Sequence, residues 1–164
     1  MKIGLLSDTH GHLDSAIFDY FKDCDEIWHA GDIGSLKLLH QLQEFKPIRA
    51  VFGNIDSLEL QQDLSEDLWF DCEGAMVLIT HIAGKPPRFN KRVLSIIKES
   101  NPPNILVCGH SHILRVMYDK TNQLLYLNPG ACGRQGFHKI RTLLRFEISD
   151  SAARNMEVIE LGNR

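Results

Sequence analysis

The N-terminal stretch Lys2-Ile3-Gly4-Leu5-Leu6-Ser7-Asp8-Thr9-His10 sets a pattern that later segments of the chain repeat. Its apolar run is too short for a typical helix, so we interpret it as a β-strand buried on both faces. In an extended backbone, residues two apart point to the same side, so Asp8 and His10 are expected to converge as half of a metal site. Alone, such a pair would more often be a polar strand end at the surface.

Four further strands are predicted to run into side chains that can bind metal. Short apolar runs at 26–30, 48–52, 75–80 and 104–108 lead into Asp32, Asn54, His81, and the pair His110 and His112. Helical spacing of apolar residues predicts helices over about 12–22, 35–45 and 90–100, the last ended by Asn101-Pro102-Pro103. Strands alternating with helices form parallel sheets, which bind ligands outside the carboxyl ends of their strands.

The rest of the sequence predicts additional β-structure. The segment 68–72 and the strand at 75–80 form a hairpin across Glu73-Gly74. After the last ligand-bearing strand, the segments at 113–118, 124–128, 140–148 and 155–161 are mostly of β type. These C-terminal segments imply a second sheet.

Length and composition indicate a single globular domain over residues 1–164. With 43% hydrophobic and 24% charged residues, the chain is neither disordered nor embedded in a membrane. The formal charge of −3 argues against a dedicated nucleic-acid or anionic-membrane surface. The N-terminal apolar run is too short for a signal peptide, so we expect a cytoplasmic protein. The four cysteines form no Cys-x-x-Cys pair, which predicts buried free thiols instead of a zinc or redox motif.

The candidate ligands are individually weak signals. Gly31-Asp32 and Gly53-Asn54 are common turn dipeptides, and His81 could be an ordinary histidine at a strand end. Taken together, the seven side chains offer three oxygen ligands and four imidazoles, a number suited to two divalent ions. Without thiolates the set favours manganese first, with iron, zinc, nickel or cobalt as alternatives. A carboxylate such as Asp32 can bridge two ions about 3.5–4 Å apart.

These motifs together resemble those of the calcineurin-like metallophosphoesterases: Asp8-Thr9-His10, Gly31-Asp32, Gly53-Asn54, His81 and Gly109-His110-Ser111-His112. The match spans about residues 1–130. The chain length and Asn128-Pro129-Gly130 are similar to the small prokaryotic phosphodiesterase branch. The resemblance implies an α/β fold, a four-layer α/β/β/α sandwich of two mixed sheets flanked by helices.

The resemblance also implies a role for each residue. One divalent ion would be held by Asp8, His10, Asp32 and His112, and the second by Asp32, Asn54, His81 and His110. Catalysis would act through this centre, with Asp32, Asn54 and His110 as its main residues and Asn54 also contacting substrate. A hydroxide bridging the ions would attack phosphorus, which implies a phosphoesterase whose substrate is a small phosphodiester.

Two positions depart from the family pattern. Ile55 follows Asn54, where protein phosphatases of this superfamily have a histidine that can protonate the leaving group. Its absence favours diesters with good leaving groups. Ile82-Ala83 follows His81, where many small members have glycine and a second histidine, so we expect a different substrate cleft.

Several other polar residues lie near the predicted site in sequence. His12 is close enough to contact substrate, and we include it with Asn54 as a candidate substrate-binding residue. Lys85 and Arg88 follow His81 on a loop, where they could either clamp phosphate or remain solvated charges. The remaining histidines, His29, His40 and His138, are expected to be structural or surface residues.

A non-catalytic alternative has the same fold. The retromer subunit of this superfamily is a protein-binding scaffold in which the ligand set is eroded. All seven ligand positions are occupied by competent side chains here, which favours catalysis. A homo-oligomer is compatible with either alternative.

Overall fold

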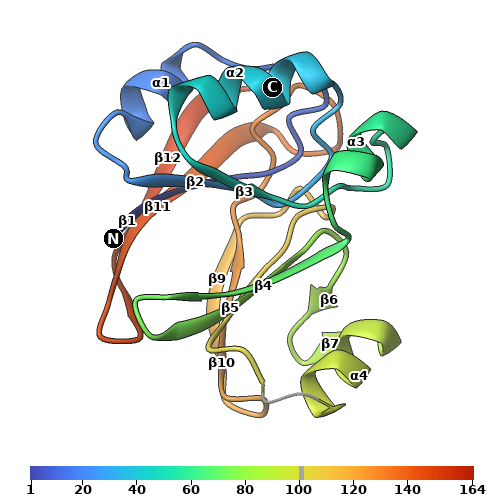
Figure 1. The fold of residues 1–164 in the computed structure, drawn as a ribbon, viewed down its shortest axis with the longest axis vertical. Helices are drawn as coiled ribbons and strands as arrows, with labels where there is room; N and C mark the ends of the chain where they lie inside the picture. The colour runs from blue at the N-terminus through green and yellow to red at the C-terminus, as the bar shows by residue number, and fades with distance from the viewer. Residues whose placement is uncertain (100–101) are drawn as a thin grey trace.

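The computed structural model describes residues 1–99 and 102–164, and two five-stranded mixed sheets form its centre (Figure 1). In the first sheet the strand order is β12-β11-β1-β2-β3. Strands β1, β2 and β3 are parallel, and β11 pairs antiparallel with β1. The bounds of these strands are β1 Lys2–Leu6, β2 Glu26–His29, β3 Ile48–Ala50, β11 Ile140–Ser149 and β12 Ala152–Asn163.

The second sheet has the strand order β4-β5-β8-β10-β9. Its three central strands are parallel, and β4 and β9 pair antiparallel at the two edges. The bounds are β4 Asp67–Cys72, β5 Ala75–Thr80, β8 Ile105–Val107, β9 Arg115–Asp119 and β10 Leu124–Asn128. A separate two-stranded ribbon, β6 (Gly84–Lys85) with β7 (Arg88–Phe89), follows β5 in the chain.

Three hydrophobic cores separate four layers. The central core lies between the two sheets and contains residues from both, including Ile3, Trp28, Val77 and Phe146. An outer core packs the first sheet against α1 (Ala16–Phe21), α2 (Leu36–Phe45) and α3 (Leu58–Asp63). The other outer core packs the second sheet against α4 (Lys91–Glu99). The predicted α/β/β/α sandwich is therefore confirmed, and Figure 1 shows α1 and α2 at one end of the molecule and α4 at the other.

The predicted strands and helices are present, with local differences. The first helix begins later than predicted because the Asp14 side chain accepts a hydrogen bond from the Ala16 amide, which holds the preceding residues in a turn. Helix α3 was not predicted, although Ser57 caps it by accepting from the Leu60 amide. The ribbon β6–β7 replaces a predicted loop. The end of the third predicted helix at Asn101 lies outside the described residues.

The implied second sheet is present, but the C-terminal strands are divided between the two sheets. Strand β11 pairs with β1, so the last two strands extend the first sheet, whereas β9 and β10 join β8 in the second. All four cysteines are buried free thiols, as predicted. In the described ranges 1–99 and 102–164, we find no helix with the length and apolarity needed to span a bilayer.

Candidate metal centre

The candidate ligands follow strands of both sheets. The parallel strands β1, β2 and β3 lead into Asp8 and His10, Asp32, and Asn54, whereas β5 and β8 lead into His81, His110 and His112. A hydrogen bond of 3.1 Å from the His110 amide to Asp8 Oδ2 connects the two sets. The carboxyl ends of both parallel arrays therefore meet at one site, and the structure brings all seven predicted residues together there.

Asp8, His10 and His112 form the first group, in which one potential ligand atom of each residue lies within 4.8 Å of the others. His112 Nε2 lies 3.2 Å from Asp8 Oδ1 and 3.4 Å from His10 Nε2. Asp8 is fully buried, and no hydrogen bond is donated to its Oδ1 atom. A buried carboxylate oxygen without a donor is costly unless a cation compensates it.

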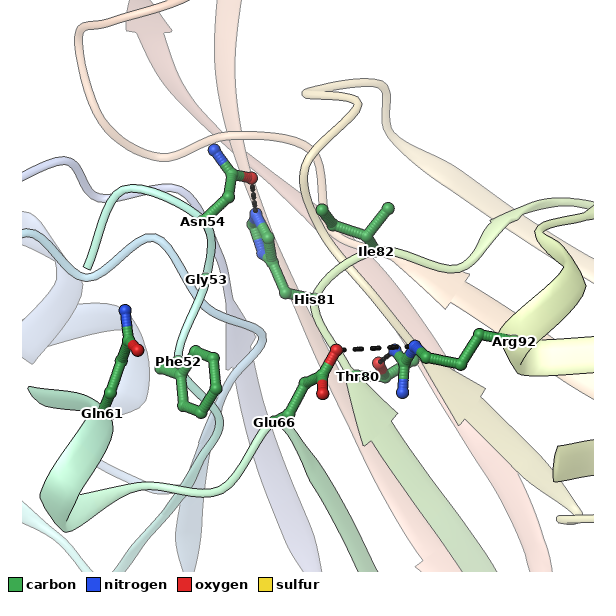
Figure 2. A pocket seen from close by; sticks show the side chains of 9 residues that line it. All are labelled: Phe52, Gly53, Asn54, Gln61, Glu66, Thr80, His81, Ile82 and Arg92. Carbon is green, nitrogen blue, oxygen red and sulfur yellow. Dashed lines mark hydrogen bonds and ion pairs between the residues drawn. The ribbon is translucent and has the colours of Figure 1, made fainter. Parts of the chain in front are cut away.

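Asp32, His81 and His110 form the second group, again with ligand atoms within 4.8 Å of one another. Asn54 adjoins this group because its Oδ1 atom lies 3.2 Å from His81 Nε2 (Figure 2). Asn54 and His110 are exposed, whereas Asp32 and His81 are buried. The second group is therefore the one that solvent and a substrate can reach most directly.

Asp32 lies between the two groups. Its Oδ2 atom is 3.6 Å from His10 Nε2, and its Oδ1 atom is 3.2 Å from His81 Nε2. The Ile55 amide also donates to Oδ1. Burial raises the pKa of Asp32, but the hydrogen bond and charge of His81 outweigh burial, so its pKa lies below the ordinary value. Asp32 is thus an ionised carboxylate positioned to contact both halves of the site.

The ring orientation of His81 indicates which nitrogen faces the site. Nδ1 lies 2.7 Å from the Ala30 carbonyl oxygen, so we assign the ring proton of the neutral form to Nδ1. The lone pair of Nε2 then faces Asp32 and Asn54 oxygens, which are acceptors as well. Burial lowers the pKa of His81, yet the neighbouring carboxylates raise it above its ordinary value. The surroundings of Nε2 therefore favour a positive charge, and the donor set fits a cation.

His138 contacts the Nδ1 atom of His112, as the Ala30 carbonyl oxygen contacts the Nδ1 atom of His81. Its Nε2 atom lies 3.0 Å from the Gly133 carbonyl oxygen, and its Nδ1 atom lies 3.2 Å from His112 Nδ1. Donation from His138 to Gly133 leaves His138 Nδ1 free to accept from His112, whose Nε2 then faces Asp8 and His10. His138 was expected to be a structural or surface residue, and its contacts place it where it can orient a candidate ligand.

The local backbone differs from the extended conformation expected for Asp8 and His10. Both have positive φ, 56° and 47°, as do Asp32, His110 and His112. Non-glycine residues with positive φ are uncommon and cluster at functional sites. The side chains converge because tight loops turn them inward, so the prediction of proximity holds although its geometric reason was wrong.

Two glycines allow these loops to approach each other. A Cβ atom at Gly31, whose φ is +94°, would lie 2.6 Å from His81 Nδ1. A Cβ atom at Gly109 would lie 1.9 Å from Ser7 Oγ and 2.8 Å from Asp8 Oδ2. Any larger residue would displace a candidate ligand.

Two further polar residues support the loops, and neither was predicted to do so. The buried Asp56 carboxylate accepts hydrogen bonds from the amides of Ile33, Gly34 and Gly53, which ties the loop after β2 to the loop after β3. Asn128 donates to the Gly109 carbonyl oxygen and accepts from the Gly130 amide. The sequence offered one signal for the role of Asp56, which is its position two residues beyond the candidate ligand Asn54.

The other polar residues near the site have different surroundings. His12 accepts a hydrogen bond of 3.2 Å from Arg134 Nε, and it is not part of either ligand group. His40 is exposed on α2. A pocket of about 220 Å³ opens beside Asn54 and His81, where Arg92 pairs with Glu66 (Figure 2). Ile82 lines this pocket. It begins the Ile82-Ala83 pair that stands where many small members of the superfamily have glycine and a second histidine.

His29 is a buried histidine that anchors the loop after β2. Its Nδ1 atom accepts from the Gly31 amide at 3.1 Å, and its Nε2 atom lies 2.9 Å from Thr9 Oγ1. Burial lowers the pKa of His29 to about 4, against the opposing effect of Asp56 and Asp8. The neutral imidazole is the form that the folded protein requires.

We expect this requirement to make stability depend on pH. Above pH 6.5 His29 is neutral in the folded and unfolded chains, so its contribution is fully present. Between pH 6.5 and 4 only the unfolded chain takes up the proton, so the free energy of unfolding falls by about 1.4 kcal/mol per pH unit. Urea unfolding of the wild type and His29→Gln should show the wild-type advantage shrinking over this range; a constant difference would contradict the assignment.

Comparison with known proteins identifies the class to which this fold and site belong. The family model described as "Calcineurin-like phosphoesterase superfamily domain" matches residues 1–151. The chain therefore belongs to the calcineurin-like phosphoesterase superfamily, as its motifs suggested.

Two archaeal relatives from Methanocaldococcus jannaschii are similar over most of the chain. One, named as a probable metallophosphoesterase, is 31% identical over 136 residues, covering 80% of this chain and 68% of the relative. The other, named as a phosphodiesterase, is 27% identical over 148 residues, covering 80% of this chain and 84% of the relative.

Solved structures with the same fold include a protein named as a phosphodiesterase and the protein Vps29. An archaeal phosphodiesterase superposes with a TM-score of 0.76 at 23% identity, covering 97% of this chain and all of that one (100%). Vps29 from Entamoeba histolytica, solved with Zn²⁺, superposes with a TM-score of 0.71 at 17% identity, covering 98% and 99%. At these identities the structures show the shared fold alone.

Proposed function

We propose that this protein is a metal-dependent phosphodiesterase whose centre holds two divalent ions. The observation that carries the proposal is the arrangement of seven side chains in two adjoining groups, with Asp32 between them. Asp8, His10, Asp32 and His112 would hold one ion, and Asp32, Asn54, His81 and His110 the other. The donor set contains oxygen and imidazole without thiolate, so manganese is our first expectation, in a cytoplasmic enzyme.

Bound divalent ions would offset the charge of a phosphoryl group and lower the pKa of a bridging water, so that hydroxide is available for hydrolysis near neutral pH. The protein residues have complementary tasks. Asn54 and His110 lie at the exposed side of the site, where they can contact the phosphate of a small diester. Burial, followed by the charge of His81, lowers the pKa of His110, which keeps its imidazole neutral. His12 stands farther out and is proposed as a substrate contact.

The principal alternative is a protein-binding scaffold like Vps29. The fold similarity is compatible with it, and the Vps29 structure with Zn²⁺ shows that metal binding alone does not distinguish the two. Catalysis is supported here by the complete ligand set and by a relative that is named as a phosphodiesterase. Turnover is therefore the property that separates the alternatives.

The test is hydrolysis of bis(p-nitrophenyl) phosphate by purified protein stripped of metal and then supplied with Mn²⁺. We expect turnover that requires the added ion, is abolished by a chelator and is lost in His81→Ala. His40→Ala removes an exposed histidine of α2 and should behave as the wild type. Tight metal binding without turnover of any diester would support the scaffold and contradict the proposal.

A further inference from the structure

A second and larger pocket lies on the other side of Ile82 from Asn54. Its volume is about 420 Å³, and it extends from His110 and Ser111 to the ribbon β6–β7. Ile82 lines both this pocket and the smaller one beside Asn54. A group attached to a phosphate at the candidate centre could therefore enter the larger pocket from the side of His110.

Three cationic side chains line this pocket: Lys85, Arg88 and Arg115. Lys85 and Arg88 are directly opposite each other in the β6–β7 register, so their side chains leave the same face of the ribbon. Arg115 comes from the start of β9 in the second sheet. Within the described ranges, none of the three forms an ion pair with an acidic side chain, unlike the neighbouring Arg92, which pairs with Glu66 and Asp67.

An anion bound in this pocket would be attracted by all three cations. Like charges directly opposite on paired strands repel each other, and a third cation of the same sign lines the same cavity. An anionic group between them would relieve the repulsion and form charge-assisted hydrogen bonds. The common placement of the three cations on one cavity is the observation that favours an anion site over separate solvated charges for Lys85 and Arg88.

Apolar side chains form part of the remaining wall. Ile82 and Ile113 are 38% and 58% exposed, so both side chains are accessible to a bound group. Tyr126 lines the pocket as well, and its hydroxyl donates to the Gly84 carbonyl oxygen at 2.8 Å, which fixes the base of the ribbon. An apolar wall with cations beyond it suits an organic group that carries an anion.

We propose that this pocket is a substrate subsite for a second phosphate group, so that the preferred substrates are phosphodiesters with an additional phosphate on one ester arm. Lys85, Arg88 and Arg115 would bind that phosphate, and Ile82 and Ile113 would contact the organic part that separates it from the scissile phosphorus. This proposal rests on the proposed phosphodiesterase function and specifies its substrate class.

A matched pair of chromogenic diesters tests the preference. The p-nitrophenyl ester of thymidine 5′-phosphate and its 3′-phosphorylated counterpart differ only in the second phosphate. Water cleaves the bond between phosphorus and the p-nitrophenyl oxygen in both, releasing p-nitrophenol with thymidine 5′-phosphate from the first compound and thymidine 3′,5′-bisphosphate from the second. We expect kcat/KM for the phosphorylated compound to be higher by about tenfold, mainly through KM, which is a moderate value for charge-assisted contacts.

The variant Lys85→Ala/Arg88→Ala should abolish this preference while leaving kcat/KM for the compound without the second phosphate near the wild-type value. The control variant Lys91→Ala/Lys98→Ala also removes two exposed cations, from α4, and should retain the preference. Thermal unfolding of both variants checks that the fold is kept. Equal kcat/KM ratios in the wild type and the pocket variant would overturn the proposal.

A binding measurement separates this inference from the proposed catalysis. Thymidine 3′,5′-bisphosphate is titrated into metal-free protein, and amide signals are followed by NMR. We expect changes at 84–85, 88–90 and 113–115, with an affinity about tenfold weaker in Lys85→Ala/Arg88→Ala. If no diester is hydrolysed, the proposed function fails and this titration alone decides the subsite. Binding that is absent, or unaffected by the variant, would overturn it.

Discussion

Asp32→Asn is expected to lower Mn²⁺-dependent diesterase activity by at least about a hundredfold, which exceeds the effect typical of a residue that only supports a ligand. The Asp32 carboxylate lies close to histidine rings of both groups, at 3.6 Å from His10 Nε2 and 3.2 Å from His81 Nε2. An amide has nearly the same shape but no negative charge, so it would weaken the attraction for both ions together.

The fold should tolerate this substitution. The Asn side chain keeps an oxygen that can accept from the Ile55 amide, as Asp32 Oδ1 does at 3.1 Å. Asp63→Asn provides a matched control because it makes the same chemical change on an exposed residue of α3. The measurement is kcat/KM with bis(p-nitrophenyl) phosphate at saturating Mn²⁺, together with metal content. Near-normal turnover by Asp32→Asn with both ions bound would exclude a bridging role.

The second large effect concerns the leaving group of the substrate. Ile55 is 45% exposed, and its amide contacts Asp32, so its side chain stands at the edge of the site without any group that can donate a proton. Protonation of a departing oxygen commonly contributes about 10²–10⁴-fold to a rate. Activity should therefore fall steeply as the pKa of the leaving alcohol rises, and aryl diesters should be cleaved better than phosphoserine.

Ile55→His offers a complementary measurement. The imidazole could restore part of the activity toward alkyl monoesters if it comes within hydrogen-bond reach of the leaving oxygen, whereas Ile55→Gln, a polar residue without a transferable proton, should not. A series of phenols and alcohols as leaving groups gives the slope for each protein. A wild-type preference for alkyl monoesters would show that another acid is present, with His12 the first residue to test.

Much of the fold could be predicted because the hydrophobic patterns are local. Ser35 begins α2 with a side chain that accepts from the Leu38 amide, and Leu38, Leu39 and Leu42 face the core at helical spacing. Strand pairing is not local, so the sequence implied a second sheet without indicating how the C-terminal strands divide between the two sheets. Nothing in the β-type segment at 140–148 indicates that it would pair with β1 as well as with its neighbour β12.

The candidate site was predictable for a related reason. Its members follow strands directly, and strand ends are marked in the sequence by glycine and polar residues such as Gly31-Asp32 and Gly109-His110. The supporting roles of Asp56 and His138 could not be predicted, because these residues contact partners in other loops. Asp56 binds amides of the loop after β2, and His138 contacts His112 from 26 positions further along the chain. Such contacts depend on how loops close in three dimensions.

The most direct test of the central claim is anomalous diffraction from crystals of the wild-type protein grown with Mn²⁺. We predict two anomalous peaks about 3.5–4 Å apart. One should lie among Asp8, His10 and His112, the other among Asn54, His81 and His110, with Asp32 contacting both. A single peak, or peaks bound away from these side chains, would contradict the account of a dinuclear centre.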